Sequence, residues 1–180
     1  MELNVKKLSE WAERIHNNAS AHGFHDERKP DEHWLCMVMT EIAEAVEADR
    51  KGSKANTEGF KKMMLYGHDF EVTYRDYIKG SIEEEFADIV IRLLDFINEK
   101  YYNSMDWDCY YYGAKAFKEY SFTQNAYRLL ASLKADTEHL LDALYFMYSW
   151  AGLYDIDLDF HIEMKMRYNE SRPIKHGKRY

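Results

Sequence analysis

The sequence predicts an all-α protein, folded as a helical bundle in a single domain over residues 1–180. Apolar residues recur at helical spacing through several long stretches, and residues that favour helix starts precede them. The composition agrees, because 46% of the residues are hydrophobic and only 2 are Pro and 8 Gly. A chain of this length can bury a sizeable core.

Two helices are expected in the first part of the chain. Residues 4–22 repeat apolar side chains at helical spacing and are followed by Gly23, a common helix stop. A second helix begins at Pro30, which suits the start of a helix, and runs to about Lys51, where Gly52 ends it.

Residues 53–80 contain three glycines and no sustained periodicity, which predicts a long connection with one short helix around residues 58–65. A connection of this length inside a compact domain is usually functional. We expect a lid over a ligand site, with four basic side chains available for phosphate: Lys54, Lys61, Lys62 and Arg75.

The stretch from Ser81 to Lys100 predicts a mostly buried helix. Ser81 followed by Glu84 is a capping-box pattern, which marks a helix start. On a helical wheel the charged residues occupy an arc of only about 100°, whereas a surface helix is polar over about half its circumference. The charges therefore share one narrow strip, which we call the polar strip: Glu84, Glu85, Asp88, Arg92 and Asp95.

Residues 101–155 are expected to form a helical insertion between two core segments, 1–100 and 156–180. The first part of the insertion is rich in tyrosine, which favours a core or subunit-interface role over stacking on bases. The remaining helices are predicted at residues 123–133, at residues 136–154, and from Asp157 or Asp159 to about Pro173.

Two pairs of carboxylates, each with members three residues apart, predict a metal site. Glu41 and Glu44 lie on the second helix, where Glu41 interrupts an apolar stripe; Glu85 and Asp88 belong to the polar strip. Ionised carboxylates in apolar surroundings are unfavourable unless cations pair with them. Oxygen ligands of this kind suit Mg²⁺, with Mn²⁺ as the alternative. The competing interpretation is a solvated helix face, where glutamates at this spacing are common.

Basic residues are concentrated at the C-terminal end. Residues 165–180 hold six Lys or Arg and one Glu, a formal charge of +5, whereas the whole chain carries −8. The acidic balance argues against general affinity for nucleic acid or an anionic membrane. The chain has no G-x-x-x-x-G-K-[ST] or G-x-G-x-x-G loop, so metal ions and basic side chains would have to bind any phosphate. The candidates are Lys165, Asn169, Arg172, Lys175 and Lys178. The competing interpretation of the basic tail is a frayed terminus.

The features that bear on location predict a cytoplasmic, soluble protein. The start of the chain lacks the apolar run of a signal peptide. The longest apolar and aromatic run, residues 143–154, is too short to span a membrane. Two cysteines do not make a disulfide framework.

The carboxylate pairs and the tail resemble those of the MazG-like all-α nucleoside triphosphate pyrophosphohydrolases, a group that includes the dimeric dUTPases. The likeness lies in the contexts EIAEAVEADRKG and EEEFADIVIRLLD and in the ending KMRYNESRPIKHGKRY. It covers the first helix through Lys100 and then residues 157–180. Three departures stand out: the 40-residue gap between the pairs is longer than usual, Thr40 replaces a frequent glutamate, and residues 101–155 look inserted.

The resemblance implies an all-α NTP pyrophosphatase type of bundle, completed by dimerisation or higher assembly. It implies Mg²⁺-dependent cleavage of a small-molecule nucleotide between its α and β phosphates, giving a monophosphate and pyrophosphate. Glu41, Glu44, Glu85 and Asp88 would bind the metal, and one of the first pair would orient or deprotonate the attacking water. The tail would meet the substrate phosphates. Candidates for contact with the base are Trp11, Trp34 and the neighbours Asn17 and Asn18.

Two other functions stay open. A di-iron carboxylate bundle uses Glu-x-x-His pairs, which Glu13 and His16 match once and residues 136–139 match only with Asp. A nucleotide sensor or regulator would keep the bundle and bind nucleotide without turnover. A zinc site at His22 and His25 has little support, because no second pair of ligands stands at suitable spacing.

Overall fold

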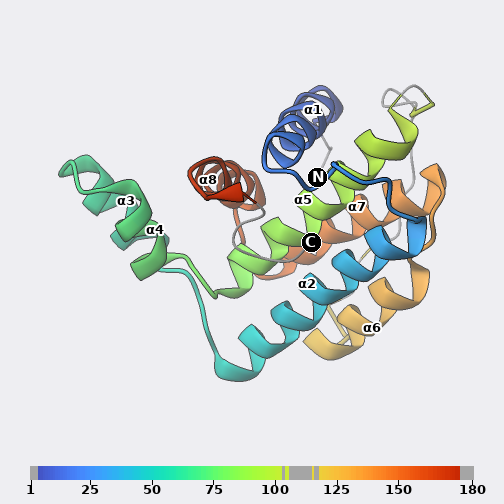
Figure 1. Ribbon diagram of the computed structural model, residues 1–180. Helices are drawn as coiled ribbons and strands as arrows, with labels where there is room; N and C mark the ends of the chain where they lie inside the picture. Colours follow the sequence, from blue (N-terminus) through green and yellow to red (C-terminus); the bar gives the residue numbers. More distant parts are fainter. Residues whose placement is uncertain (1–3, 103, 106–114, 116–117, 175–180) are drawn as a thin grey trace.

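The computed structural model describes residues 4–102, 104–105, 115 and 118–174. Within these residues the chain is all-helical (Figure 1), which confirms the predicted fold class. None of the described helices combines the length and apolar character that a membrane crossing requires. The helices are α1 Val5–Ala21, α2 Asp31–Lys51, α3 Thr57–Leu65, α4 Phe70–Tyr77, α5 Ile82–Tyr101, α6 Phe122–Ser132, α7 Thr137–Leu153 and α8 Leu158–Glu170.

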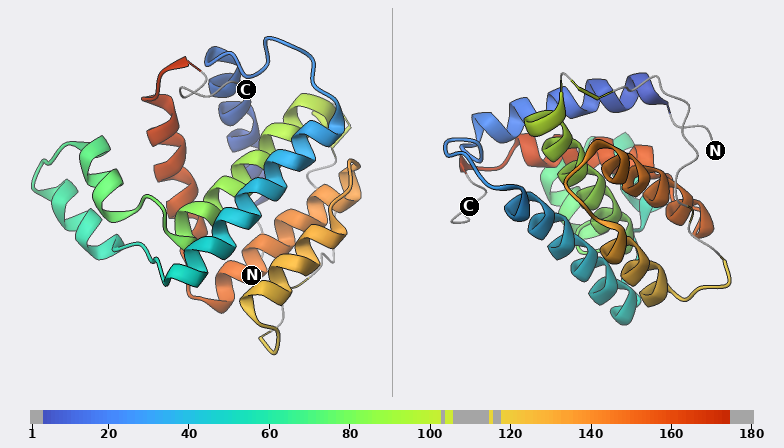
Figure 2. Two further views of the ribbon diagram at one scale, coloured as in Figure 1. Left: turned by 60° about the horizontal axis from the view of Figure 1, so that its bottom comes forward. Right: turned by 90° about the vertical axis from the view of Figure 1, so that its right-hand side faces the viewer.

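Helix α5 is the centre of the bundle. It packs against α1, α2, α7 and α8, and Figure 2 shows it between these helices. Its apolar side chains from Ile82 to Ile97 are buried, as the narrow polar strip predicted. The residues with no exposed surface include Phe86, Ile89, Val90, Leu93 and Leu94.

The helix starts follow the capping residues that the sequence indicated. The Ser81 side chain accepts a hydrogen bond from the Glu84 backbone N–H, and Asp136 and Asp157 cap α7 and α8 in the same way. The capping box at α5 is only half formed, because the Glu84 carboxylate accepts from the backbone N–H of Gly80 instead of that of Ser81. Glu84 therefore bonds the residue that precedes the N-cap of its own helix.

Residues 53–80 form two helices, so the predicted short helix around residues 58–65 is confirmed as α3, whereas the second helix was not predicted. The second helix, α4, begins after Asp69, whose side chain accepts from the backbone N–H of Val72. Eight residues are too few to show a clear helical period. Helices α3 and α4 form a hairpin beside α8 (Figure 1) and share a small hydrophobic cluster with it: Phe60, Tyr74, Ile78 and Tyr168.

Helices α6 and α7, from the segment predicted as an insertion, belong to the main hydrophobic core. Trp150 on α7 is fully buried, and its ring centroid lies 4.7 Å from those of both Phe86 and Phe122. Helices α6 and α7 therefore help to fix the position of α5. Most of the tyrosine-rich stretch that was predicted as an interface, residues 106–114, lies outside the described residues.

Candidate metal and phosphate site

A cavity of about 400 Å³ lies between α1, α2, α5 and α8. All four predicted carboxylates line it, and so do three of the predicted phosphate-binding residues. The structure thus brings the acidic pairs and α8 to one place, as the sequence predicted. Lys175 and Lys178 lie outside the described residues. The predicted residues that line the cavity are Glu41, Glu44, Glu85, Asp88, Lys165, Asn169 and Arg172.

Three of the four carboxylates form a tight group. Glu41, Glu44 and Glu85 each offer one carboxylate oxygen, and these three atoms lie within 4.8 Å of one another. Glu41 and Glu85 are buried, while Glu44 is exposed. Like charges at this separation repel strongly when they are shielded from water. A cation between the three oxygens would remove this repulsion.

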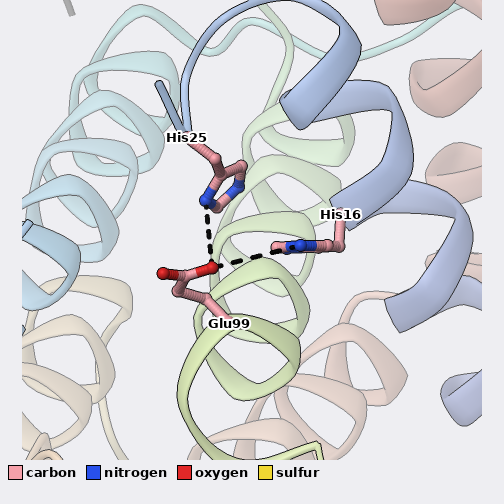
Figure 3. A group of neighbouring side chains, drawn as sticks. All are labelled: His16, His25 and Glu99. Atoms are coloured by element: carbon pink, nitrogen blue, oxygen red, sulfur yellow. Dashed lines mark ion pairs between the residues drawn. The ribbon is translucent and has the colours of Figure 1, made fainter. Parts of the chain in front are cut away.

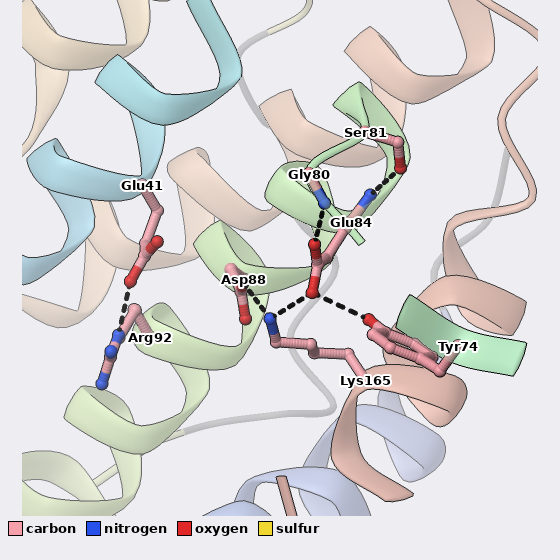
Figure 4. Close-up of polar contacts among 8 residues, drawn as sticks. All are labelled: Glu41, Tyr74, Gly80, Ser81, Glu84, Asp88, Arg92 and Lys165. Carbon is pink, nitrogen blue, oxygen red and sulfur yellow. Dashed lines mark hydrogen bonds and ion pairs between the residues drawn. The ribbon is translucent and has the colours of Figure 1, made fainter. Parts of the chain in front are cut away.

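Asp88 faces a lysine instead. One of its oxygens lies 2.6 Å from Lys165 Nζ, which also donates a 2.6 Å hydrogen bond to Glu84 (Figure 4). Lys165 is buried, so in this structure it neutralises two carboxylates of α5 and does not extend into solvent. The prediction treated Lys165 only as a phosphate ligand, because its partners are far from it in the sequence.

A second basic side chain engages the group from the other side. Arg92 Nε donates a 3.0 Å hydrogen bond to Glu41 Oε1 (Figure 4). Although burial opposes the charged form of Arg92, Glu41 and Asp88 raise its pKa above the ordinary value. The chain therefore supplies cations to Glu41 and Asp88, two of the four predicted ligands, from within the cavity wall.

The remaining negative charge favours proton uptake. Burial raises the pKa of Glu85 to about 8, with Asp88 and Glu84 adding to the rise and Lys165 opposing it. Burial also raises the pKa of Asp88 to about 7, because it outweighs the opposing effect of Lys165. Burial opposes the charged form of Lys165 too, but Asp88 and Glu84 raise its pKa above the ordinary value. Protons and metal ions would thus compete for this site near neutral pH.

Glu84 is the site residue whose role the sequence did not show. It is buried and accepts hydrogen bonds from Lys165 and from the Tyr74 hydroxyl, the latter at 3.1 Å. The capping-box pattern alone accounts for a glutamate at position 84, so it offered no reason to place Glu84 in the cavity. Its position in the polar strip, one turn before Asp88, was the available signal.

The basic residues at the cavity differ partly from the expected ones. Lys79 lines the cavity, whereas none of the four basic residues expected in a lid over residues 53–80 does. Lys61, for example, lies over the ring of Phe160, 4.9 Å from its centroid. Arg14 on α1 also lines the cavity and pairs with Glu163 and Glu170 of α8.

The candidates for base contact are only partly at the cavity. Trp34 is buried in the core, where its ring stacks on His25 and Phe96 at centroid distances of 5.0 and 6.1 Å. Asn17 is exposed and does not line the cavity, whereas Asn18 does. These positions give Trp34 a packing role and make Asn18 the better placed of the two asparagines.

The pairs that suggested a di-iron bundle lie elsewhere. Glu13 is exposed, and His16 is directed toward carboxylates at the far end of α5. His139 contacts Asp136, the cap of α7, at 2.7 Å. Neither pair lines the acidic cavity.

Comparison of the chain with protein-family models, curated proteins and solved structures gave no match. The all-helical fold class rests on the structure itself. The family resemblance stays a prediction.

Proposed function

We propose that this protein is a Mg²⁺-dependent nucleoside triphosphate pyrophosphohydrolase that cleaves between the α and β phosphates. The observation that carries the proposal is one cavity lined both by the carboxylate group Glu41, Glu44 and Glu85 and by basic side chains. Carboxylates alone would suit a bare cation, and basic residues alone would suit an anion. Their presence on facing walls suits a metal-bound polyphosphate. The resemblance to MazG-like enzymes points to the same reaction.

The donor set fits magnesium. Glu41, Glu44 and Glu85 offer only carboxylate oxygens, which Mg²⁺ prefers to nitrogen or sulfur. When bound, Mg²⁺ would supply charge neutralisation for phosphate oxygens and a more acidic water. A volume of about 400 Å³ lies within the range of small-molecule pockets.

The side chains of the cavity divide the remaining tasks. Lys165 keeps Glu84 and Asp88 neutralised, and Arg92 holds Glu41 in place. Glu44 is the more exposed member of its pair, so we assign it the role of orienting the attacking water. Cleavage breaks the bond between the α-phosphorus and the bridging oxygen, and pyrophosphate leaves with that oxygen.

Three side chains of the cavity wall are assigned to the substrate. Lys79 and Arg172 carry positive charge suited to phosphate oxygens. The Oδ1 atom of Asn169 is buried and has no hydrogen-bond partner within the described part of the chain. A buried amide oxygen without a donor is unfavourable, so a ligand hydroxyl or N–H would satisfy it.

The proposal is tested by measuring pyrophosphate release from canonical and modified (d)NTPs with Mg²⁺. Glu85→Gln removes a buried ligand while keeping the shape of the side chain, so we expect kcat/KM to fall by about 100-fold or more. Glu47→Gln is the matched control, because Glu47 lies on α2 and pairs with Arg50 and Lys51 outside the cavity. A folded wild-type protein that hydrolyses no nucleotide would contradict the proposal.

A nucleotide sensor is the second candidate. Lys165 and Arg92 already neutralise part of the acidic group, so the site is partly satisfied without a metal ion. A sensor would be stabilised by nucleotide, with a higher Tm, and would release no pyrophosphate. Assembly into dimers or larger oligomers, which the resemblance implies, belongs to the main proposal and is checked by light scattering.

A further inference from the structure

A second group of possible ligands lies toward the other end of α5. It consists of His16 on α1, His25 in the connection after α1, and Glu99 on α5 (Figure 3). One ligand atom from each lies within 4.8 Å of the others. We call this group the histidine cluster. Its three members do not line the acidic cavity, whereas Asp95, which contacts both imidazoles, does.

Asp95 orients the two imidazole rings from the other side. His25 Nε2 lies 2.9 Å from Asp95 Oδ1, and His16 Nδ1 lies 3.5 Å from the same oxygen. A neutral imidazole carries one N–H, so a donor at His25 Nε2 leaves a lone pair at Nδ1. Carboxylates in this position commonly fix the tautomer of metal-binding histidines.

The surroundings of the His25 Nδ1 atom suggest that it binds a ligand. The His25 side chain is only 9% exposed, and its Nδ1 is buried without a hydrogen-bond partner within the described residues. Glu99 Oε2 lies 3.3 Å away, but the contact does not have hydrogen-bond geometry. A ring nitrogen and a carboxylate oxygen this close, with no hydrogen bond between them, are unfavourable unless positive charge lies nearby. A cation held by both atoms would supply that charge.

The spacing of the ligand atoms fits a small transition-metal ion. A tetrahedral zinc site with bonds of about 2.0–2.2 Å places its ligand atoms about 3.3–3.6 Å apart. His25 Nδ1 lies 3.3 Å from Glu99 Oε2, and His16 Nε2 lies 4.0 Å from that oxygen (Figure 3). His16 would have to move inward to complete such a set of ligands.

We propose that His16, His25 and Glu99 bind a transition-metal ion of the zinc type, with Asp95 as a positioning residue. Two imidazoles and one carboxylate are a donor set that zinc favours and that magnesium does not. The ion would join α1 and the connection after it to α5. It would therefore stabilise the folded protein.

The test is calorimetric titration of the full-length, chelator-treated protein with Zn²⁺. We expect one ion per chain at this cluster, a higher Tm with Zn²⁺, and a visible spectrum of tetrahedral type when Co²⁺ replaces Zn²⁺. Glu99→Gln should weaken Zn²⁺ binding by at least about tenfold, and Asp95→Asn by about 10- to 100-fold. His68→Gln is the matched control, because His68 is exposed in the turn between α3 and α4.

Glu85→Gln separates this site from the acidic cavity, since it should leave Zn²⁺ affinity at the cluster unchanged. The proposal is overturned if the wild type does not bind Zn²⁺ at micromolar concentration. It is equally overturned if Glu99→Gln and His25→Gln bind Zn²⁺ as tightly as the wild type, or if the bound zinc is lost in Glu85→Gln instead.

Discussion

The acidic cavity and the histidine cluster lie along one face of α5 but differ in what surrounds their carboxylates. In the cavity, Glu85 and Asp88 face other carboxylates, and Lys165 supplies part of the missing positive charge. In the histidine cluster, Glu99 lies beside imidazoles, and so does Asp95, which also lines the cavity. Carboxylates on one helix thus have other carboxylates and a lysine beside them at one end and imidazoles at the other.

Arg92 stands between the two groups. Its guanidinium bonds Glu41 and interacts electrostatically with Asp88 and Asp95. Asp95 is kept ionised: although burial opposes its charged form, His16 and His25 lower its pKa below the ordinary value. A carboxylate's neighbours from other helices, more than its position on α5, therefore decide which protonation state it favours.

The largest effect on stability is expected from Lys165→Met. It leaves Glu84 and Asp88 buried without their cation, so the free energy of unfolding should fall by about 3–5 kcal/mol at alkaline pH. Urea denaturation measures this loss. Lys7→Met is the control, because the half-exposed pair of Lys7 and Asp159 should contribute at most about 1 kcal/mol. An equal loss in the two variants would contradict the prediction.

A smaller effect is expected from pH on the metal-free protein. Glu85 has a pKa of about 8 in the folded state against 4.5 ordinarily, so the folded chain binds more protons than the unfolded chain between these values. The free energy of unfolding should therefore fall as pH rises from about 4.5 to 8. In a chain of this size, each loss of about 1 kcal/mol lowers Tm by about 2–4 °C. Thermal unfolding in chelator measures the slope.

In Glu85→Gln, stability should depend less on pH. Mg²⁺ should stabilise the wild type more at pH 8 than at pH 6, because the ionised carboxylate binds the metal. The prediction is wrong if the metal-free wild type becomes more stable as pH rises through this window.

The smallest expected effect is that of Glu99→Gln on hydrolysis. Because Glu99 does not line the acidic cavity, kcat/KM for the nucleotide should stay within about twofold of the wild type. Pyrophosphate release with Mg²⁺ measures it. A large loss of activity would show that the two groups act as one site and would contradict their separation.

Local patterns predicted much of the fold. The burial of Glu41 could be predicted because this residue interrupts an apolar stripe on a single helix. The starts of α5, α7 and α8 could be predicted from Ser81, Asp136 and Asp157, whose side chains bond the first turn of their own helices. Such signals depend only on neighbours in the sequence. Helix α4 was missed because it is short and its burial depends on α3 and α8.

The parts of the site that were missed depend on contacts between distant residues. Lys165 pairs with Glu84, 81 residues earlier in the chain, and no local pattern of either residue indicates the other. The histidine cluster likewise draws its three members from α1, a connection and α5. The spacing of these residues matches no motif, so only the packing of α1 on α5 brings them together.

The hydroxyl of Tyr74 links the α3–α4 hairpin to the acidic cavity, although residues of α3 and α4 do not line that cavity. Tyr74 stacks on Tyr168 with ring centroids 4.4 Å apart, inside a cluster separate from the main core. Such a unit can open without unfolding the bundle. Amide protons of the hairpin would then exchange with deuterium more slowly when Glu84 is held firmly, because its bond to Tyr74 adds to the contacts of the cluster.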